Sequence, residues 1–334
     1  MLDYTLFGES HGPVVGVLLR HVPAGLPVDG LQMERELLRR SPNGQLSTAR
    51  RETDQVQLLS GVFQGYTTGM PLVMVILNRD ARSEDYDALR TVVRPGHADY
   101  TAHVKAKGFQ DYRGGGHFSG RLTAPLVAAG SIAKTALLAR GVTVAAHIVD
   151  EENLRRRAAE AKAEGDSVGG VLETAILGLP AGVGEPYFDS VESKLAHLAF
   201  SIPAVKGIEF GSGFGFADQK GSEANDAFRM QEERIVTATN HNAGLNGGIS
   251  NGMPVVFRTA VKPTPSIYKT QDTVDYITKK DAELSIQGRH DPCIVPRAAI
   301  VQTCAAALAV GDLLTAKYGM AWMEDPTGYR KEVL

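Results

Sequence analysis

Residues 123–139 read TAPLVAAGSIAKTALLA, and this run sets the first constraint on the fold. The run predicts a long helix. Thr123 can cap the start of this helix, and Pro125 falls in the first turn, where a missing backbone N–H costs little. A second long run, 298–317, predicts another helix near the end of the chain.

Shorter segments between these two runs carry both helix and strand signals. Further helices are expected at 31–40, 100–107, 152–163 and 190–199. Runs of β-branched and aliphatic residues predict strands at 14–19, 56–59, 72–77, 142–149, 171–177 and 255–261. The elements are mixed without strict βαβ alternation, and no Pro- or Ser-rich linker divides them. We therefore expect a single domain over residues 1–334, of the α/β or α+β class.

The composition limits what kind of protein this is. With 43% hydrophobic and 22% charged residues, the 334-residue chain has the mixture of a globular protein that can bury a full core. A formal net charge of -3 argues against nucleic acid as a partner. No signal peptide is evident and no apolar run reaches about 18 residues, so no membrane association is expected. Cys293 and Cys304 show no pairing motif, which fits the cytoplasm.

The stretch FGESHG at residues 7–12 fits the GxSxG spacing of a hydrolase nucleophile elbow. Such an elbow needs a strand before the serine and a helix directly after it. Here a β-leaning run, PVVGVLL, follows the motif, and few residues precede it. Ser10 is therefore not expected to form an acyl intermediate, although a serine hydrolase is kept as a competing hypothesis.

Four loop-like stretches gather Gly, His, Arg and Ser without helix or strand periodicity. They are residues 7–12, 94–99, 111–121 and 288–297, and they contain His11, His97, His117 and His290. No HxH, HxxxH or CxxC spacing appears among them, so no metal site is expected.

The stretch DYRGGGHFSGR at 111–121 suggests an anion site. Its three consecutive glycines would let the backbone approach a ligand, and Arg113 and Arg121 lie just before a predicted helix start. Between Arg94 and Arg121 there are five Lys or Arg residues against two Asp. This local excess favours a small anion such as a phosphate, while a glycine-rich turn with surface arginines remains the alternative.

Taken together, these stretches resemble the chorismate synthase family, and the similarity runs through most of the chain. The motifs that carry the resemblance are FGESHG (7–12), ETDQVQLLSGVFQGYTTGMPL (52–72), RPGHADY (94–100), DYRGGGHFSGR (111–121), SIPAVKGIEFG (201–211), NAGLNGGISNGMPV (242–255), VKPTPSI (261–267) and GRHDPCIVPRA (288–298).

The resemblance implies a fold and a reaction. The fold would be a homotetramer whose protomers sandwich helices between antiparallel sheets. The reaction would be the anti 1,4-elimination of phosphate from 5-enolpyruvylshikimate 3-phosphate to give chorismate, the last common step of aromatic amino-acid biosynthesis. It would require reduced FMN. Electrons would come either from NADPH used directly or from a separate flavin reductase, and the resemblance does not decide between them.

The resemblance also implies roles for individual residues. His11 would serve the leaving phosphate, and His97 would lie against the reduced flavin. The proton relay would be completed by Ser10, Ser119 and Asp291. FMN contacts would fall on His117, Phe118, Ser119, Ala204, Gly247, Lys262, Pro263, Thr264, Pro265, Ser266 and Arg289. The substrate anions would be bound by Arg40 (or its neighbour Arg39), Arg94, Arg121 and Arg289.

Several positions depart from the commoner pattern of the family. His117 and Leu122 stand where many members have Arg and Glu, and Pro203 stands where some have Asn. An expected Arg is absent around Gln45 and Leu46, for which Arg50 or Arg51 would have to compensate. None of these touches His11 or His97, so activity is expected. A flavin-binding protein that has lost its chemistry is the remaining competing hypothesis.

Overall fold

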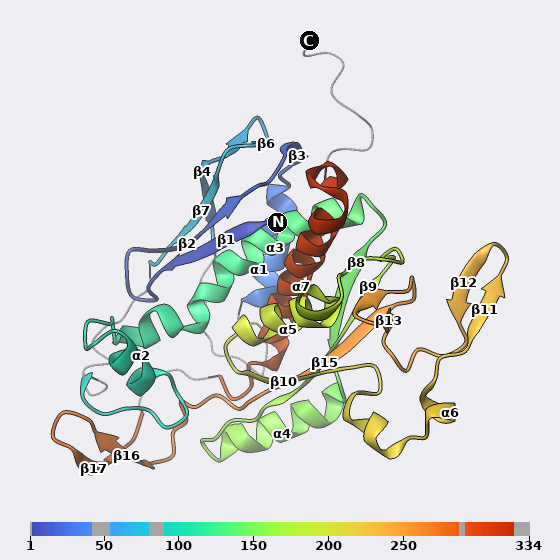
Figure 1. The fold of residues 1–334 in the computed structure, drawn as a ribbon. Helices are drawn as coiled ribbons and strands as arrows, with labels where there is room; N and C mark the ends of the chain where they lie inside the picture. The colour runs from blue at the N-terminus through green and yellow to red at the C-terminus, as the bar shows by residue number, and fades with distance from the viewer. Residues whose placement is uncertain (1, 42–53, 80–89, 287–290, 324–334) are drawn as a thin grey trace.

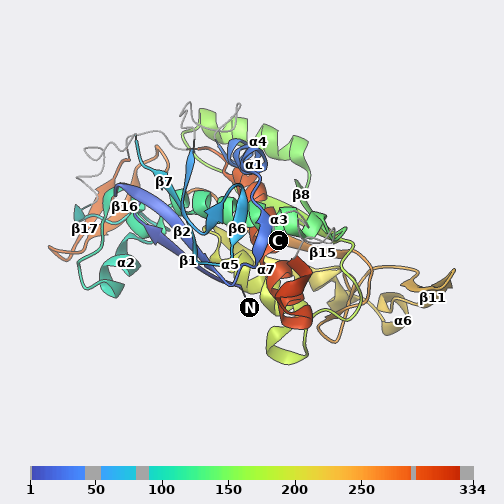
Figure 2. The ribbon, with the colours of Figure 1, turned by 90° about the horizontal axis from the view of Figure 1, so that it is seen from above.

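Two four-stranded antiparallel sheets enclose a layer of helices in the computed structural model, which describes residues 2–41, 54–79, 90–286 and 291–323. Figure 1 shows the two sheets on opposite sides of the long helices, and Figure 2 gives the same arrangement from above. The expected class, helices sandwiched between antiparallel sheets, is confirmed.

The first sheet is built from the N-terminal part of the chain. Its strands lie in the order β1 (Asp3–Gly8), β2 (Val14–Arg20), β7 (Leu72–Leu77) and β4 (Val56–Ser60). β1 and β2 form a hairpin with Leu6 opposite Val17 and Gly8 opposite Val15. The connection between these two strands carries residues 9–13, so the FGESHG motif lies at the end of the hairpin.

The second sheet comes from the middle of the chain. Its order is β10 (Val205–Phe210), β15 (Val255–Val261), β9 (Gly170–Leu177) and β8 (Thr143–Ile148). Buried and more exposed residues alternate along β15, which is the pattern of a sheet with one face against a core.

Helices α1 (Gly30–Arg40), α3 (Thr123–Leu138), α5 (Val191–Ser201) and α7 (Val295–Tyr318) fill the space between the sheets. α3 packs on β2 and β7, while α7 packs on β8 and β9. α3 and α7 also pack closely on each other: a Cβ added at Gly130 would lie 2.3 Å from the Cβ of Cys304. Both helices are buried on nearly all sides because each contacts a sheet and the other helix.

Smaller helices and hairpins lie around this core. α2 (Asp99–Lys105) and the hairpin of β16 (Gln271–Asp275) and β17 (Lys280–Leu284) lie side by side at one end. The hairpin of β11 (Phe228–Gln231) and β12 (Arg234–Thr237) projects away from the body. The remaining elements are α4 (Glu151–Ala163), α6 (Gly221–Ala224), β3 (Ala24–Pro27), β5 (Val62–Phe63), β6 (Tyr66–Thr68), β13 (Leu245–Asn246) and β14 (Ile249–Ser250).

The helices and strands expected from the sequence are all present, with ends shifted by a few residues. The capping role of Thr123 was wrong, because Leu122 occupies the cap position of α3. The Thr123 hydroxyl instead donates a hydrogen bond to the Gly120 carbonyl and accepts one from Arg40 Nε. Strands β1 and β10 were missing from the expectations.

The expectation that no apolar run approaches membrane-spanning length was too strict. By length and composition α7 could cross a membrane, with a mean hydropathy of 1.6 in its most apolar window. However, 94% of that window is buried inside the fold, between α3, α5 and the second sheet. The core position of α7 accounts for its composition.

The close contact of α3 and α7 predicts an effect of Gly130→Ala. The added methyl would overlap Cys304, so we expect the free energy of unfolding to fall by about 1–3 kcal/mol. Urea denaturation measures this change. Gly221→Ala is the matched control, because its methyl meets nothing within 4 Å. A stability of Gly130→Ala equal to that of the control would contradict the packing described here.

Candidate active site

Three consecutive glycines form the turn on which the site is built. Gly114, Gly115 and Gly116 have φ values of 59°, 84° and 52°, a region that side chains rarely adopt. A Cβ at Gly114 would lie 2.2 Å from the His11 ring, and one at Gly115 would lie 3.0 Å from the His97 ring. We call residues 114–116 the triglycine turn. It brings together two histidines that are 86 positions apart in the chain.

The triglycine turn packs against side chains of the site, and an approach of its backbone to a ligand stays a prediction. The atoms nearest to added Cβ groups belong to Ser10, His11, Arg94, His97 and Asp111. Arg113, considered for the same anion, instead pairs with Asp111 at 2.8 Å. That hydrogen-bonded ion pair, opposed by partial burial, lowers the pKa of the Asp111 carboxyl. The glycines therefore serve the packing of the histidines.

Ser10 is held by the same turn. Its backbone N–H donates to the Gly116 carbonyl at 3.1 Å, and its hydroxyl lies 3.1 Å from the Gly114 carbonyl and 3.0 Å from His11 Nδ1. The motif connects strand β1 to strand β2, and no helix follows Ser10. The geometry of a nucleophile elbow is absent from this stretch, so the serine hydrolase hypothesis loses its structural basis.

His97 belongs to a second cluster, with Arg94 and Asp99. His97 Nδ1 lies 2.6 Å from Asp99 Oδ1, and Arg94 donates to the same carboxylate from Nε at 2.8 Å and from NH2 at 2.7 Å. Burial alone would raise the pKa of Asp99, but the hydrogen bonds from Arg94 and His97 hold that pKa well below its usual range. His97 Nδ1 also lies 3.0 Å from Arg94 Nη2, and its Nε2 faces Gly115 in the triglycine turn.

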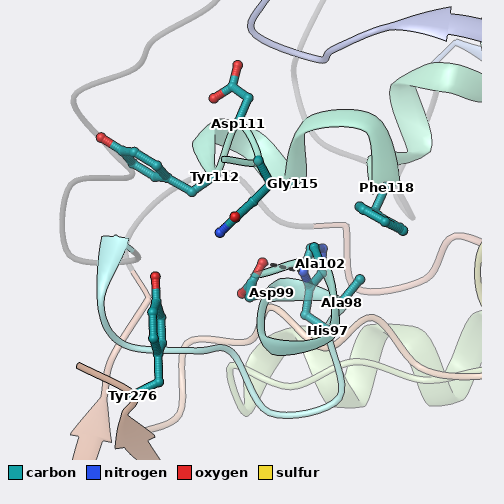
Figure 3. A pocket seen from close by; sticks show the side chains of 10 residues that line it. His97, Ala98, Asp99, Ala102, Asp111, Tyr112, Gly115, Phe118 and Tyr276 are labelled. Carbon is teal, nitrogen blue, oxygen red and sulfur yellow. Dashed lines mark hydrogen bonds and ion pairs between the residues drawn. The ribbon is translucent and has the colours of Figure 1, made fainter. Parts of the chain in front are cut away.

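A pocket opens beside this cluster. It is lined by His97, Asp99, Tyr112, Phe118 and Tyr276, among others. Figure 3 shows the backbone at Gly115 facing the His97–Asp99 pair, with Phe118 on one side and Tyr276 on the other. The Phe118 ring is 41% exposed, which leaves an aromatic surface available next to His97.

Two of the predicted substrate arginines share one buried carboxylate. Arg40 NH1 contacts Asp54 Oδ2 at 2.9 Å, and Arg121 NH1 contacts Asp54 Oδ1. The Asp54 side chain is only 2% exposed. Two guanidinium groups held by one carboxylate place forked cationic donors at this point, the kind of group that binds an anion. Arg39 points elsewhere: its side chain is 56% exposed and pairs with Glu36.

The segment Lys262–Ser266 joins the His97 cluster to Asp291. Lys262 Nζ donates to the Gly96 carbonyl, and Arg94 NH1 donates to Ser266 Oγ at 3.5 Å. Thr264 Oγ1 donates to the Asp291 carbonyl at 3.2 Å. The Lys262 N–H also bonds the carbonyl of Ala204, whose φ is 75°. Lys262 and Ser266 therefore contact the residues around His97, while Thr264 contacts Asp291.

Asp291 and Ser119 are placed by neighbouring side chains. Asp291 Oδ2 accepts a 2.6 Å hydrogen bond from Arg297 NH1 on α7, and Arg297 Nε also donates to the Arg40 carbonyl. Ser119 follows the triglycine turn and accepts from the Arg121 N–H at 3.3 Å. Arg289 and His290, together with the positions around Gln45, Leu46, Arg50 and Arg51, lie outside the described residues.

Gly247 lies apart from the other predicted cofactor contacts. It forms the turn between β13 and β14, beyond the start of β15, whereas Lys262 follows the end of that strand. The adjacent Gly248 carbonyl accepts from the Val191 N–H at the start of α5. Within one protomer, the structure does not bring Gly247 to His97.

The departures from the family pattern have structural roles. His117 Nδ1 lies 2.9 Å from the Gly8 carbonyl and links the triglycine turn to the end of β1. Leu122 is buried in the core, and Pro203 lies exposed in the turn before β10. The sequence reasoning missed Asp54, Asn78, Asp99 and Arg297, which orient the predicted residues. The sequence signal for Asp54, Asp99 and Arg297 was their position inside the quoted motifs.

The fold and the site define an α/β protein that places two histidines on a glycine turn near buried arginines. A sequence model described as chorismate synthase matches residues 2–157 and 149–315. Curated chorismate synthases of Thermococcus gammatolerans and Chitinophaga pinensis are 46% and 48% identical to this chain, covering 94% and 92% of it and 96% and 93% of their own lengths. A crystal structure of chorismate synthase superposes with a TM-score of 0.75 at 26% identity, covering 96% of this chain and 95% of that one. The chain belongs to the chorismate synthase family, whose members are carbon–oxygen lyases.

From the geometry of the triglycine turn we predict that Gly114→Ala lowers turnover strongly while the protein stays folded. The methyl would overlap His11 and Ser10 at a left-handed φ, so the ring must move. We expect turnover to fall by at least about 100-fold. Steady-state assays with circular dichroism as a folding check measure this. Gly215→Ala is the control, since its methyl meets nothing within 4 Å. Wild-type turnover in Gly114→Ala would refute the role of the turn.

A pH effect is predicted for Asp226, which orders the loop leading to β13. Burial alone would raise the pKa of Asp226, but hydrogen bonds from Thr239, Asn242 and His241 lower it to about 2. Its stabilising contribution is therefore complete above the unfolded value of about 4 and is lost as pH falls from there towards 2. Asp226→Asn should be less stable than wild type at pH 7 in urea titrations, and the difference should narrow below pH 4. A stability difference that grows as the pH falls would contradict the predicted direction.

Proposed function

We propose that this chain converts 5-enolpyruvylshikimate 3-phosphate to chorismate by anti 1,4-elimination, with reduced FMN as its cofactor. The observation that carries the proposal is the triglycine turn, which holds His11 and His97 on the fold of this family. In this reaction the C–O bond to phosphate breaks and one proton leaves C6. Two separate proton-handling groups in one site suit these two events.

His11 would act at the departing phosphate. Expelled phosphate oxygens need protonation or neutralisation, and an imidazole changes charge near neutral pH. The Ser10 hydroxyl at 3.0 Å fixes the orientation of the His11 ring. Arg121 and Arg40, both held by Asp54, would supply guanidinium donors to the phosphate oxygens.

The residues beside His97 fit a flavin mononucleotide. A phosphate-bearing planar ring needs cationic and hydroxyl donors together with an aromatic surface, and Lys262, Thr264, Ser266 and Phe118 supply these groups. His97, held by Asp99, would present Nε2 towards the bound ring and hold a proton there. When bound, reduced FMN supplies the electron chemistry that the elimination needs. Asp291, fixed by Arg297, would complete the proton relay near the flavin N5, where the C6 proton is expected to go.

Further properties are proposed on the resemblance to the family. We infer a homotetramer, a cytoplasmic location and electrons delivered by NADPH or a separate reductase. Two cysteines that are both unpaired and buried fit a reducing compartment. Light scattering tests the assembly, since a monomer of 35.7 kDa would exclude the tetramer.

An anaerobic assay tests the proposed function directly. Purified protein, dithionite-reduced FMN and 5-enolpyruvylshikimate 3-phosphate should release chorismate and phosphate in equal amounts. His97→Ala should still bind FMN and lose most turnover, because the ring contact is removed while Lys262 and Phe118 remain. Bound flavin and substrate without product from the wild-type chain would instead indicate a flavin-binding protein that has lost its chemistry. Full activity of His97→Ala would remove His97 from the mechanism.

A further inference from the structure

Asn78 uses every hydrogen-bonding atom of its side-chain amide inside the site. It follows β7 directly, and its Nδ2 donates to the Glu9 and Gly12 carbonyls, both at 2.9 Å. Its Oδ1 accepts from Arg121 Nε at 3.0 Å. Its backbone N–H adds a fourth bond, to the Pro13 carbonyl at 3.1 Å.

These bonds join two parts of the site that do not otherwise share a side chain among the contacts described above. The carbonyls of Glu9 and Gly12 bracket Ser10 and His11 on the turn between β1 and β2. Arg121 belongs to the charged group that includes Asp54 and Arg40. Asn78 therefore bridges the proton-handling turn and the anion-binding arginines.

We infer that Asn78 is a positioning residue that couples the placement of His11 to anion binding at Arg121. The inference rests on the proposed function, because it assigns His11 and Arg121 their roles in that reaction. A shift of the Arg121 guanidinium on binding an anion would be transmitted through Oδ1 to the two bonds that hold the 9–12 turn. Substrate capture and the position of the catalytic ring are linked by this one side chain.

The amide is suited to this position by its chemistry. Two donors and one acceptor are required, and among side chains of this length only Asn has both. Asp would keep an acceptor for Arg121 but lose both donors and place its charge against two carbonyls. Ala would leave the two carbonyls and Arg121 Nε without these partners, each such loss being unfavourable in a partly buried site.

The test separates the two halves of the bridge. In Asn78→Asp both donors are lost, and the retained acceptor adds a negative charge beside Arg121. KM for 5-enolpyruvylshikimate 3-phosphate should therefore rise, while kcat should fall by about tenfold or more and by a larger factor than the change in KM. In Asn78→Ala both halves are lost, so KM should rise and kcat should fall. Calorimetric titration with the substrate measures the change in binding affinity separately from turnover.

A double-mutant cycle with Arg121→Lys shows whether the effect on binding passes through Arg121. Asn78→Ala should weaken substrate binding several-fold in the wild-type background and have little effect once Arg121 is Lys. The control is Asn225→Ala at the end of α6, where the side chain is exposed, and it should match wild type in every parameter. If Asn78→Ala fails to fold, the relative sizes of the changes in kcat and KM in Asn78→Asp still test the inference.

Several outcomes would overturn the inference while leaving the proposed function intact. These are wild-type kinetics in both Asn78 variants, multiplicative binding effects in the cycle, or equal changes of kcat and KM in Asn78→Asp. The proposed function fails separately, when the wild-type chain itself releases no chorismate. Calorimetry on the same variants then still reports whether Asn78 and Arg121 are coupled.

Discussion

The contact of two glycines with two histidines is the constraint on which the rest of the site depends. Gly114 and Gly115 leave no room for a Cβ, because the rings of His11 and His97 occupy the space. The two rings come from distant segments of the chain: one from the β1–β2 hairpin, the other from the loop before α2. A side chain in the turn would separate them, so the backbone itself sets the distance between the two proton-handling groups.

The buried arginines near the triglycine turn are held by carboxylates. Asp99 neutralises Arg94 and orients His97, whereas Asp54 is shared between Arg40 and Arg121. A buried guanidinium without a partner would be costly. The shared carboxylate holds both guanidinium groups in place, where they can also donate to a bound anion. Arg297, near the N-terminal end of α7, forms a similar salt bridge with Asp291.

Long apolar segments were predictable from the sequence, and contacts between distant segments were not. α3, α7 and β15 follow from their own composition, because each buries most of its surface. β1 and β10, with sequences DYTLFG and VKGIEF, are largely half-buried and lack a clear alternation. The glycines of residues 114–116 were found, but their close contact with His11 was not predictable, since His11 lies about a hundred positions earlier. Thr123 was assigned to a cap because Arg40, which it contacts, could not be foreseen.

A crystal structure of this chain with 5-enolpyruvylshikimate 3-phosphate and FMN tests the central claim most directly. The account predicts that both molecules lie against the triglycine turn, with the substrate phosphate beside His11 and the flavin ring beside His97. It also predicts that the glycines keep their left-handed φ values. Ligands bound away from the turn, or a turn that rearranges so that the histidines separate, would contradict the account.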